Sequence, residues 1–165
     1  MKKLAVILAM IGVSLFVVAC AGANTKEASA PGSAESVAEK VPMNETEYVE
    51  EFHKIMSSLS GDKDIYVEQY GYAVDDNNKE GKQNAALQLN TKVVNAYGDI
   101  VDLGVAPEQY AKDIDTISKA LTESSQHFGK ASDSLTPESD ADTEWQQGLA
   151  RLEEALSLAY ELTKK

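Results

Sequence analysis

The stretch 43-MNETEYVEEFHKIMSSL-59 decides the fold class, because it carries both the start signal and the apolar spacing of a helix. Asn44 is a favoured N-cap residue, and Glu47 three positions later completes a capping-box pattern. The apolar residues recur every three or four positions, as on one face of a helix: Tyr48, Phe52, Ile55, Met56 and Leu59. The sequence predicts an amphipathic helix that ends at Ser60-Gly61-Asp62, where Gly61 suits a left-handed C-cap.

Three further helices are expected downstream. The stretch 62–80 fits neither the helical nor the strand period, and we interpret it as a short helix or ordered excursion that leads into a turn at 75-DDNN-78. Helices then follow from about Glu80 to Leu103, from Pro107 and after Pro137. Each of these helices carries one apolar stripe. The stripe of the helix from Glu80 consists of Leu89, Val93, Tyr97, Ile100 and Val101, and that of the helix from Pro107 consists of Tyr110, Ile114, Ile117, Leu121, Phe128 and Ala131. The stripe of the helix after Pro137 consists of Trp145, Leu149, Leu152, Leu156, Ala159 and Leu162.

These patterns predict an all-α fold. No segment alternates apolar and polar residues over the length of a strand, and short connections make neighbouring helices antiparallel. We therefore expect residues 43–165 to form one domain, an up-and-down antiparallel bundle of three long helices plus one shorter N-terminal helix. Residues 20–42 are rich in Ala, Ser, Gly, Glu and Lys, which predicts a flexible, disordered tether ahead of the bundle.

The first nineteen residues have the parts of an export signal. Lys2 and Lys3 precede an apolar run, and the run ends at Val17-Val18-Ala19-Cys20. This motif resembles the lipobox of bacterial lipoproteins, with Val17 where Leu is usual. The resemblance implies that residues 1–19 are a signal peptide and that the thiol of Cys20, the only cysteine, receives a diacylglycerol group. Cleavage before Cys20 then frees its amine, which is a further site for acylation. It also implies a lipid anchor in the cell membrane or outer membrane, with the domain on the extracytoplasmic side.

The net negative charge of the chain limits the classes of partner that it can bind. The formal net charge of −12 becomes −14 once Lys2 and Lys3 are removed with the signal. Such a surface is repelled by nucleic acid and by anionic lipid headgroups. Acidity of this kind serves solubility, and it also suits a cationic protein or peptide as partner.

Motifs for metal binding are incomplete. Asp76, Asn78, Glu80 and Gly81 imitate the start of an EF-hand loop, but Leu87 occupies the twelfth position, where a bidentate Glu is required. His53 and His127 lack a second histidine at zinc-binding spacing: they are expected to be ordinary surface or boundary residues. We expect neither a metal nor another cofactor.

Motifs for catalysis are equally incomplete. Ser60-Gly61-Asp62-Lys63 matches the bare S-x-x-K pattern without its companion motifs, and no G-x-S-x-G elbow follows the signal. Acidic pairs such as Asp113 and Asp115 do not share a helical face. We therefore expect that the protein is not an enzyme.

Tyrosines offer the best candidate for a binding surface. Tyr66, Tyr70 and Tyr72 precede Asp75 and Asp76, and tyrosines bury area while keeping a polar group. The sequence leaves open whether they bind a partner or close the end of the bundle. Two functions follow as hypotheses, a protein- or peptide-binding module of the cell envelope and, as the alternative, a small-ligand carrier or sensor with a tyrosine-lined pocket. In plan the chain is similar to small bacterial lipoproteins with a helical-bundle domain of unassigned function.

Overall fold

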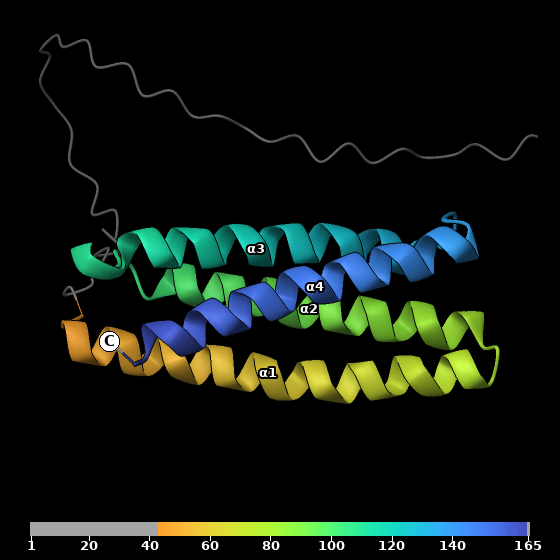
Figure 1. Cartoon of the computed structure of the whole chain (residues 1–165), viewed down its shortest axis with the longest axis horizontal. Coiled ribbons are helices and arrows are strands. Elements are labelled where there is room, and N and C mark those ends of the chain that lie inside the picture. Colours follow the sequence, from red (N-terminus) through yellow and green to blue (C-terminus); the bar gives the residue numbers. More distant parts are fainter. Residues whose placement is uncertain (1–42, 165) are drawn as a thin grey trace, which may run out of the picture. The chain divides into compact units, whose positions relative to one another are not determined.

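The computed structural model describes residues 43–164, and every regular element in that part of the chain is a helix (Figure 1). The four helices are α1 (Glu45–Asp75), α2 (Lys79–Asp102), α3 (Glu108–Ser132) and α4 (Glu138–Leu162). The all-helical fold class is thereby confirmed. The expected shorter N-terminal helix is wrong, because α1 has 31 residues and is the longest of the four.

Helix α1 continues through Gly61, where the sequence suggested that it would stop. Its buried side does not end at Leu59 but goes on to Tyr70 and Ala73. Asp62 interrupts the apolar stripe, yet its carboxylate lies 3.2 Å from the ammonium group of Lys92 on α2. A glycine inside a helix costs about 1 kcal/mol relative to alanine. Burial of a large apolar side chain contributes about 1.5–3 kcal/mol, so tertiary packing outweighs the local stop signal.

The other helix boundaries follow the local signals. Asn44 accepts a hydrogen bond from the backbone N–H of Glu47 at 3.0 Å, and the expected capping box is present. The expected turn after α1 is confirmed, with Asn77 at φ 51° and the side chain of Asn78 capping α2. Gly104, at φ 91°, follows the end of α2. This conformation suits glycine because it has no Cβ.

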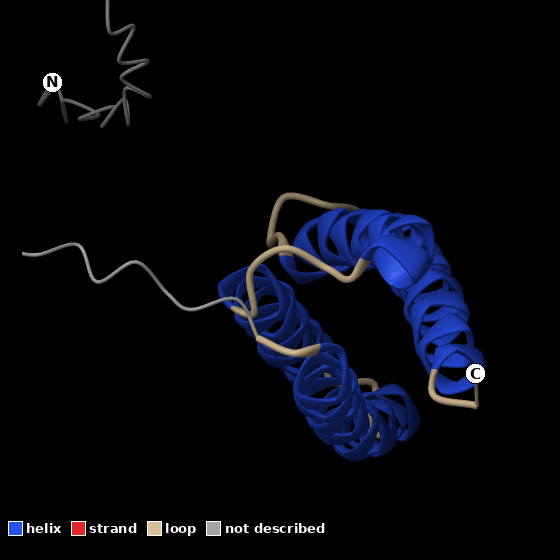
Figure 2. Cartoon of the chain, turned by 90° about the vertical axis from the view of Figure 1, so that its left-hand side faces the viewer, coloured by secondary structure: helices blue, strands red, loops and turns tan. Residues whose placement is uncertain are grey.

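Each helix packs mainly against its neighbours in the chain. The α1–α2, α2–α3 and α3–α4 pairs make extensive contacts, whereas α1 and α4 make few. Figure 2 shows the C-terminal end of α4 lying apart from the ends of α1 and α2. The starts of α1 and α3 meet, because Gln109 and Tyr110 donate hydrogen bonds to Glu45. The starts of α2 and α4 also meet, through Lys82 and Asp142.

The α3–α4 interface is the closest of these because a glycine lies in it. A Cβ atom placed on Gly148 of α4 would be 2.7 Å from Cε1 of Phe128 on α3. The hydroxyl group of buried Ser124 donates a 2.9 Å hydrogen bond to the carbonyl oxygen of Gly148. Helix α3 therefore touches the backbone of α4 and not only its side chains.

Helix α2 buries a different set of residues from the one expected. Leu89, Val93 and Ile100 are buried as expected, but Tyr97 and Val101 are exposed and the small Ala96 faces the core instead. The reason is that α2 carries two apolar stripes, and the inner one uses alanine to let the neighbouring helices approach. In α3 and α4 most of the expected core positions are buried, including Ile114, Ile117, Leu121, Phe128, Trp145 and Leu152.

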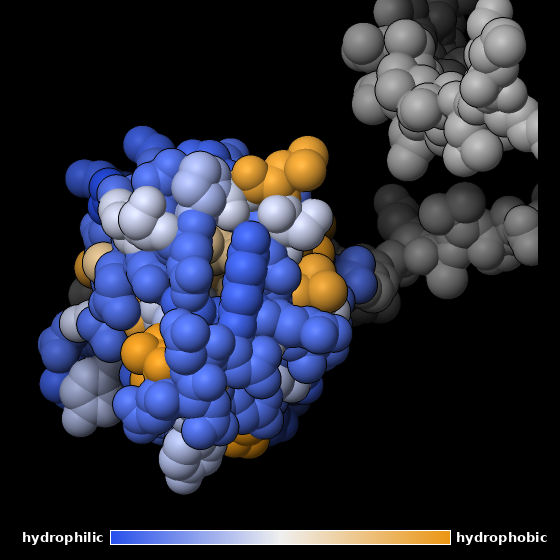
Figure 3. Space-filling model, turned by 90° about the vertical axis from the view of Figure 1, so that its right-hand side faces the viewer, coloured by the Kyte–Doolittle hydropathy of each residue, from blue (hydrophilic) through white to orange (hydrophobic). Residues whose placement is uncertain are grey.

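The surface is mostly hydrophilic with separate apolar spots. Figure 3 shows one end of the molecule, where hydrophilic residues surround small hydrophobic patches. The two most exposed large apolar residues among those described are Val105, between α2 and α3, and Leu135, between α3 and α4. Exposed apolar residues that gather in one place can mark an interaction site.

Candidate functional site: the groove between α1 and α4

Helices α1 and α4 are joined at one end by stacked aromatic rings. The rings of Tyr70 on α1 and Trp145 on α4 are parallel within 3°, with centroids 4.1 Å apart. Phe128 of α3 packs against the other side of this pair, with its centroid 5.1 Å from that of Trp145. Stacked aromatic pairs contribute about 0.5–1.5 kcal/mol beyond the burial of their area. This cluster holds α4 against α1 at the end where α4 begins.

A polar network covers the aromatic cluster. Tyr70 donates a 2.5 Å hydrogen bond to the carboxylate of Asp142, which also accepts one from Lys82 at 3.1 Å. The ammonium group of Lys82 lies 2.6 Å from Glu138 as well, so this buried lysine has two acidic partners. Because every member is paired, the network links α1, α2 and α4 without leaving a buried charge unsatisfied.

The network changes the pKa of Tyr70, Asp142 and Lys82. Burial, and then the hydrogen bond to Asp142, raises the pKa of Tyr70. Burial also acts to raise the pKa of Asp142, but the hydrogen bonds from Tyr70 and Lys82 together with the lysine's charge outweigh it and lower that pKa. The hydrogen bond to Glu138 raises the pKa of Lys82 despite burial. Lys82 therefore stays a cation at neutral pH, and it is not a nucleophilic amine.

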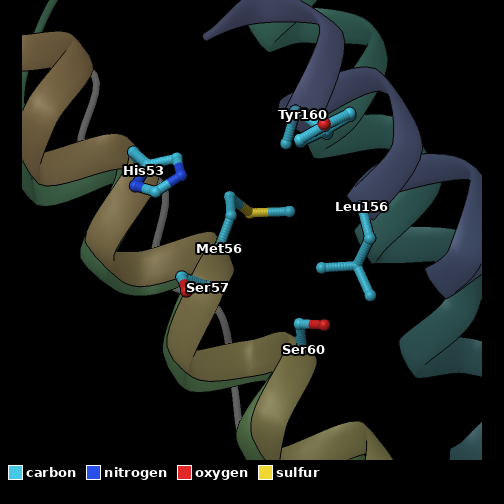
Figure 4. Close-up of a pocket in the computed structure, with 7 residues that line it drawn as sticks. His53, Met56, Ser57, Ser60, Leu156 and Tyr160 are labelled. Atoms are coloured by element: carbon cyan, nitrogen blue, oxygen red, sulfur yellow. The ribbon is translucent and has the colours of Figure 1, made fainter.

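Towards its C-terminal end α4 separates from α1 and leaves a groove. A cavity of about 130 Å³ lies between the helices, lined by His53, Met56, Ser57, Ser60, Leu156, Ala159 and Tyr160. Figure 4 shows Met56 pointing from α1 towards α4 and Leu156 pointing back towards α1. Met56 and Ala159 are buried and form the apolar floor, whereas His53, Ser57 and Tyr160 are exposed at the rim.

The groove continues along α1 beyond His53. A shallower hollow of about 420 Å³ adjoins it, lined by Val49, Glu50, His53, Lys54 and Thr163. His53 belongs to both spaces, so together they form one continuous feature on the α1–α4 side. This feature offers a small apolar recess, hydroxyl groups and a histidine, which can receive an apolar side chain and hydrogen-bond the groups around it.

The tyrosine surface expected from the sequence is divided in the structure. Tyr70 is 5% exposed and belongs to the core, and Tyr66 is half-buried against it. Tyr72 points outward and donates a hydrogen bond to Glu68. Asp75 and Asp76 are exposed at the end of α1. Of the tyrosines, Tyr160 lines the α1–α4 cavity and is 60% exposed.

The two histidines lie in different places. His53 is at the rim of the groove, whereas the ring of His127 lies 2.6 Å from the carboxylate of Glu144 at the α3–α4 interface. The hydrogen bond from His127 lowers the pKa of Glu144, and Lys130 adds to this effect against burial. The two histidines thus do not line the same cleft.

Several motifs of the sequence lie within helices or at their ends. Asn78, in the EF-hand-like stretch, caps α2 by accepting a hydrogen bond from the N–H of Gly81 at 2.9 Å. Ser60 and Lys63, of the S-x-x-K pattern, lie inside the continuous helix α1. Among the described residues, no group of three or more His, Cys, Asp or Glu is arranged to hold a metal ion.

The lipobox residues Val17, Val18, Ala19 and Cys20 lie outside the described residues, as do the signal and the tether. Within residues 43–164, none of the helices has the length and apolar character needed to cross a membrane.

The groove was missed at the sequence level because its walls come from positions about 100 residues apart. A usable signal did exist: Leu156, Ala159 and Tyr160 mix apolar and polar character on one side of α4, as Met56, Ser57 and Ser60 do on α1. Comparisons with protein-family profiles, curated proteins and solved structures yield no match to this chain.

Proposed function

We propose that the protein is an exported, lipid-anchored lipoprotein whose helical domain is a non-catalytic peptide-binding module of the cell envelope. The lipobox-like Val17-Val18-Ala19-Cys20 supports the anchor, which lies in the cell membrane or the outer membrane. Two acyl chains, at about 0.8 kcal/mol per buried methylene, hold a protein on a membrane stably. The domain then faces the extracytoplasmic side, and residues 20–42 tether it.

We also infer that the helices run up and down in an antiparallel bundle. Contacts between the starts of α1 and α3, and between the starts of α2 and α4, support this arrangement. The short connections at residues 76–78, 103–107 and 133–137 support it too. In such a bundle α1 and α4 are neighbours as the first and last helices, and their partial separation leaves the groove.

The observation that carries the proposed binding function is the apolar floor of this groove between two helices that make few contacts. Met56 and Ala159 are themselves buried, and they form the base of a recess that is open to solvent. A drug-sized ligand usually occupies about 300–1,000 Å³. The recess has about 130 Å³, which suits one inserted side chain and favours a peptide over the small-ligand alternative.

The chemistry of the peptide follows from the charge of the whole domain. With a net charge of −12 before processing, the protein attracts cations over distances of about a Debye length, roughly 8 Å at physiological ionic strength. Local contacts at the groove come from Glu50, His53 and Tyr160. We therefore propose a partner segment that places one apolar side chain in the recess and basic residues outside it.

Photo-crosslinking in cells tests this proposal with two closely matched positions. Tyr160, on α4 at the groove, and Tyr72, on the side of α1 that faces away from the groove, are 60% and 61% exposed. A benzophenone side chain therefore fits equally well at both positions. We expect a defined adduct from position 160 in the full chain and none from position 72. A partner trapped only at position 72 would instead place the binding surface on the outer side of α1.

Blocking the groove supplies the second half of the test. Ser57→Trp fills the recess from α1, and its neighbour Ser58, also exposed but absent from the cavity lining, gives the matched control Ser58→Trp. The adduct from position 160 should disappear with Ser57→Trp and persist with Ser58→Trp. Equal adduct in both variants would count against the groove as the binding site.

The anchor is tested independently of the groove. Cys20→Ser removes the acyl acceptor, so the variant should lose metabolic labelling by palmitate that the unmodified chain retains. Labelling that survives the substitution would contradict lipidation at Cys20, and it would leave the groove proposal untouched.

A further inference from the structure

Helix α2 carries a second apolar stripe that faces away from its own chain. Leu87, Val94 and Val101 are spaced seven residues apart and are 50%, 50% and 58% exposed. Asn84, Thr91 and Gly98 stand at the intervals of three and four residues that complete a heptad pattern, and Val105 follows them in the loop just past the end of α2; all four are exposed. We call these seven residues the α2 seam. Apolar heptads bury themselves against another helix, and none of the other three helices covers this one.

The central part of the α2 seam is poor in charge. Charged residues make up 25% of the chain, yet Lys92 is the only one from Gln83 to Gly98; Glu80 precedes this stretch, and Asp99 and Asp102 follow it. The ammonium group of Lys92 is turned to the α1 side, where it lies 3.2 Å from Asp62. The residues beside the seam are amides instead, including Gln88 and Asn95. Amide side chains both donate and accept hydrogen bonds, so they can pair with copies of themselves.

Gly98 has no role inside its own chain that would explain it. It lies in the interior of α2, where glycine destabilises a helix relative to alanine. An added Cβ atom would meet nothing within 4 Å. A glycine on a seam allows the backbone of another helix to come close, as glycine does at tight helix crossings.

We propose that the α2 seam is the contact surface for a second copy of this chain, paired with it antiparallel about a two-fold axis at Val94. Two copies that each carry a large negative charge repel one another over most of their surfaces. They can meet at least electrostatic cost where both are uncharged, and a two-fold dimer brings the same patch together from each copy. The charge-free α2 seam is such a patch.

The geometry of this pairing is complementary along its length. With Val94 on the axis, Leu87 of one copy faces Val101 of the other. Val105, which is 96% exposed, lies in the loop after α2 and extends the apolar surface beyond Val101. Gln83, Asn84 and Leu87 lie in the wall of an open hollow of about 410 Å³. Val101 of one copy is thus placed opposite a residue that borders an open space on the other.

The size of the α2 seam sets the strength of the contact. Residues 84–102, the helical part of the seam, extend about 27 Å, and a strip about 10 Å wide along it covers roughly 270 Å² per copy. Stable interfaces bury about 800 Å² per partner. The dimer is therefore a weak, reversible one, and a covalent trap is the appropriate way to detect it.

Disulfide trapping of the full chain in cells tests the proposal. The only native cysteine is Cys20, so the chain without an added cysteine is the background control. Val94→Cys should give a disulfide-linked dimer on oxidation, because the two-fold axis brings both copies of position 94 together. Val74→Cys, on the outside of α1 and 48% exposed, is the matched control for random collision and should give none.

Two more cysteine positions determine the direction of the pairing. In the antiparallel dimer the two copies of position 87 are about 21 Å apart, far beyond the roughly 7 Å between Cα atoms that a disulfide spans. Leu87→Cys alone and Val101→Cys alone should therefore not form dimers, whereas mixing the two should. Dimers from each single variant would show parallel pairing and overturn the proposed axis.

A charged residue introduced at the two-fold axis distinguishes specific association from random collision. Val94→Lys, added to the mixed Leu87→Cys and Val101→Cys chains, should reduce the dimer yield at least tenfold, because it places two ammonium groups face to face. Val74→Lys in the same background should leave the yield unchanged. Equal trapping at positions 94 and 74, or trapping only to a different protein, would overturn self-association through the α2 seam.

Discussion

Replacing Gly148 with Ala should destabilise the domain, although the same exchange usually stabilises a helix. Alanine is favoured over glycine inside a helix by about 1 kcal/mol. The added Cβ would lie 2.7 Å and 2.8 Å from two ring atoms of Phe128, distances that force a shift. Phe128 is fully buried and packs against Trp145, so its ring cannot move without displacing the aromatic cluster. Overpacking of this kind costs about 1–3 kcal/mol.

The matched control is Gly61→Ala. Gly61 also lies inside a long helix, but an added Cβ meets nothing within 4 Å there. The helix-propensity gain of about 1 kcal/mol should appear undiminished at this position. We therefore expect Gly61→Ala to raise the free energy of unfolding by about 1 kcal/mol and Gly148→Ala to lower it by up to about 2 kcal/mol.

Urea unfolding of residues 39–165, which form one compact unit, measures both changes. The midpoint concentration should shift in opposite directions for Gly61→Ala and Gly148→Ala while the slope stays constant, as expected when only stability changes. Equal stabilisation by the two variants would refute the reasoning, because it would mean that α3 and α4 can separate at no cost at Gly148.

The remaining predictions concern the polar contacts. Tyr70→Phe keeps the stacked ring but loses the 2.5 Å hydrogen bond to Asp142, and it should lower the free energy of unfolding by about 1.5 kcal/mol in urea titration. Ser124→Ala, which removes the hydrogen bond to Gly148, should cost about 1 kcal/mol in the same assay, and no change would show that the hydroxyl is dispensable. The pKa values of Asp142 and Glu144 are lowered by folding, so the unfolded chain binds more protons; this stability should be fully present above about pH 5 and be lost as the pH falls through the folded pKa values. Asp142→Asn should make the acid side of a thermal-melting profile shallower, and an unchanged profile would contradict this assignment.

The sequence predicted the helices and most of their ends because these depend on local signals. The capping box at Asn44 and the turn before Asn78 need only neighbouring residues. The end of α1 could not be predicted in this way, because Gly61 and Asp62 look like a stop signal. What carries the helix past them is the burial of Tyr70 and Ala73 against other helices, which no neighbouring residue signals.

The candidate site was less predictable than the fold. Tyr97 and Val101 fit the apolar period of α2 as well as Ala96 does, and only the packing of α1 and α3 decides which stripe is buried. Similarly, Tyr70 and Tyr72 differ by two positions and so point to different sides of α1. The groove depends on how far α4 diverges from α1, which no local pattern records.

The aromatic stack at one end of α1 and α4 is the point about which the width of the groove at the other end can change. Tyr70 and His53 are 17 residues apart, or about 26 Å along the helix. If the α1–α2 pair and the α3–α4 pair each move as a rigid body, a relative rotation of about 5° at the stack would therefore change the width of the groove at its rim by roughly 2 Å. The hold of the groove on the proposed peptide then depends on the stiffness of contacts far from the peptide. We expect Trp145→Leu, which loosens this joint, to reduce crosslinking from position 160 without touching the groove itself, and unchanged crosslinking would show that the two ends are mechanically independent.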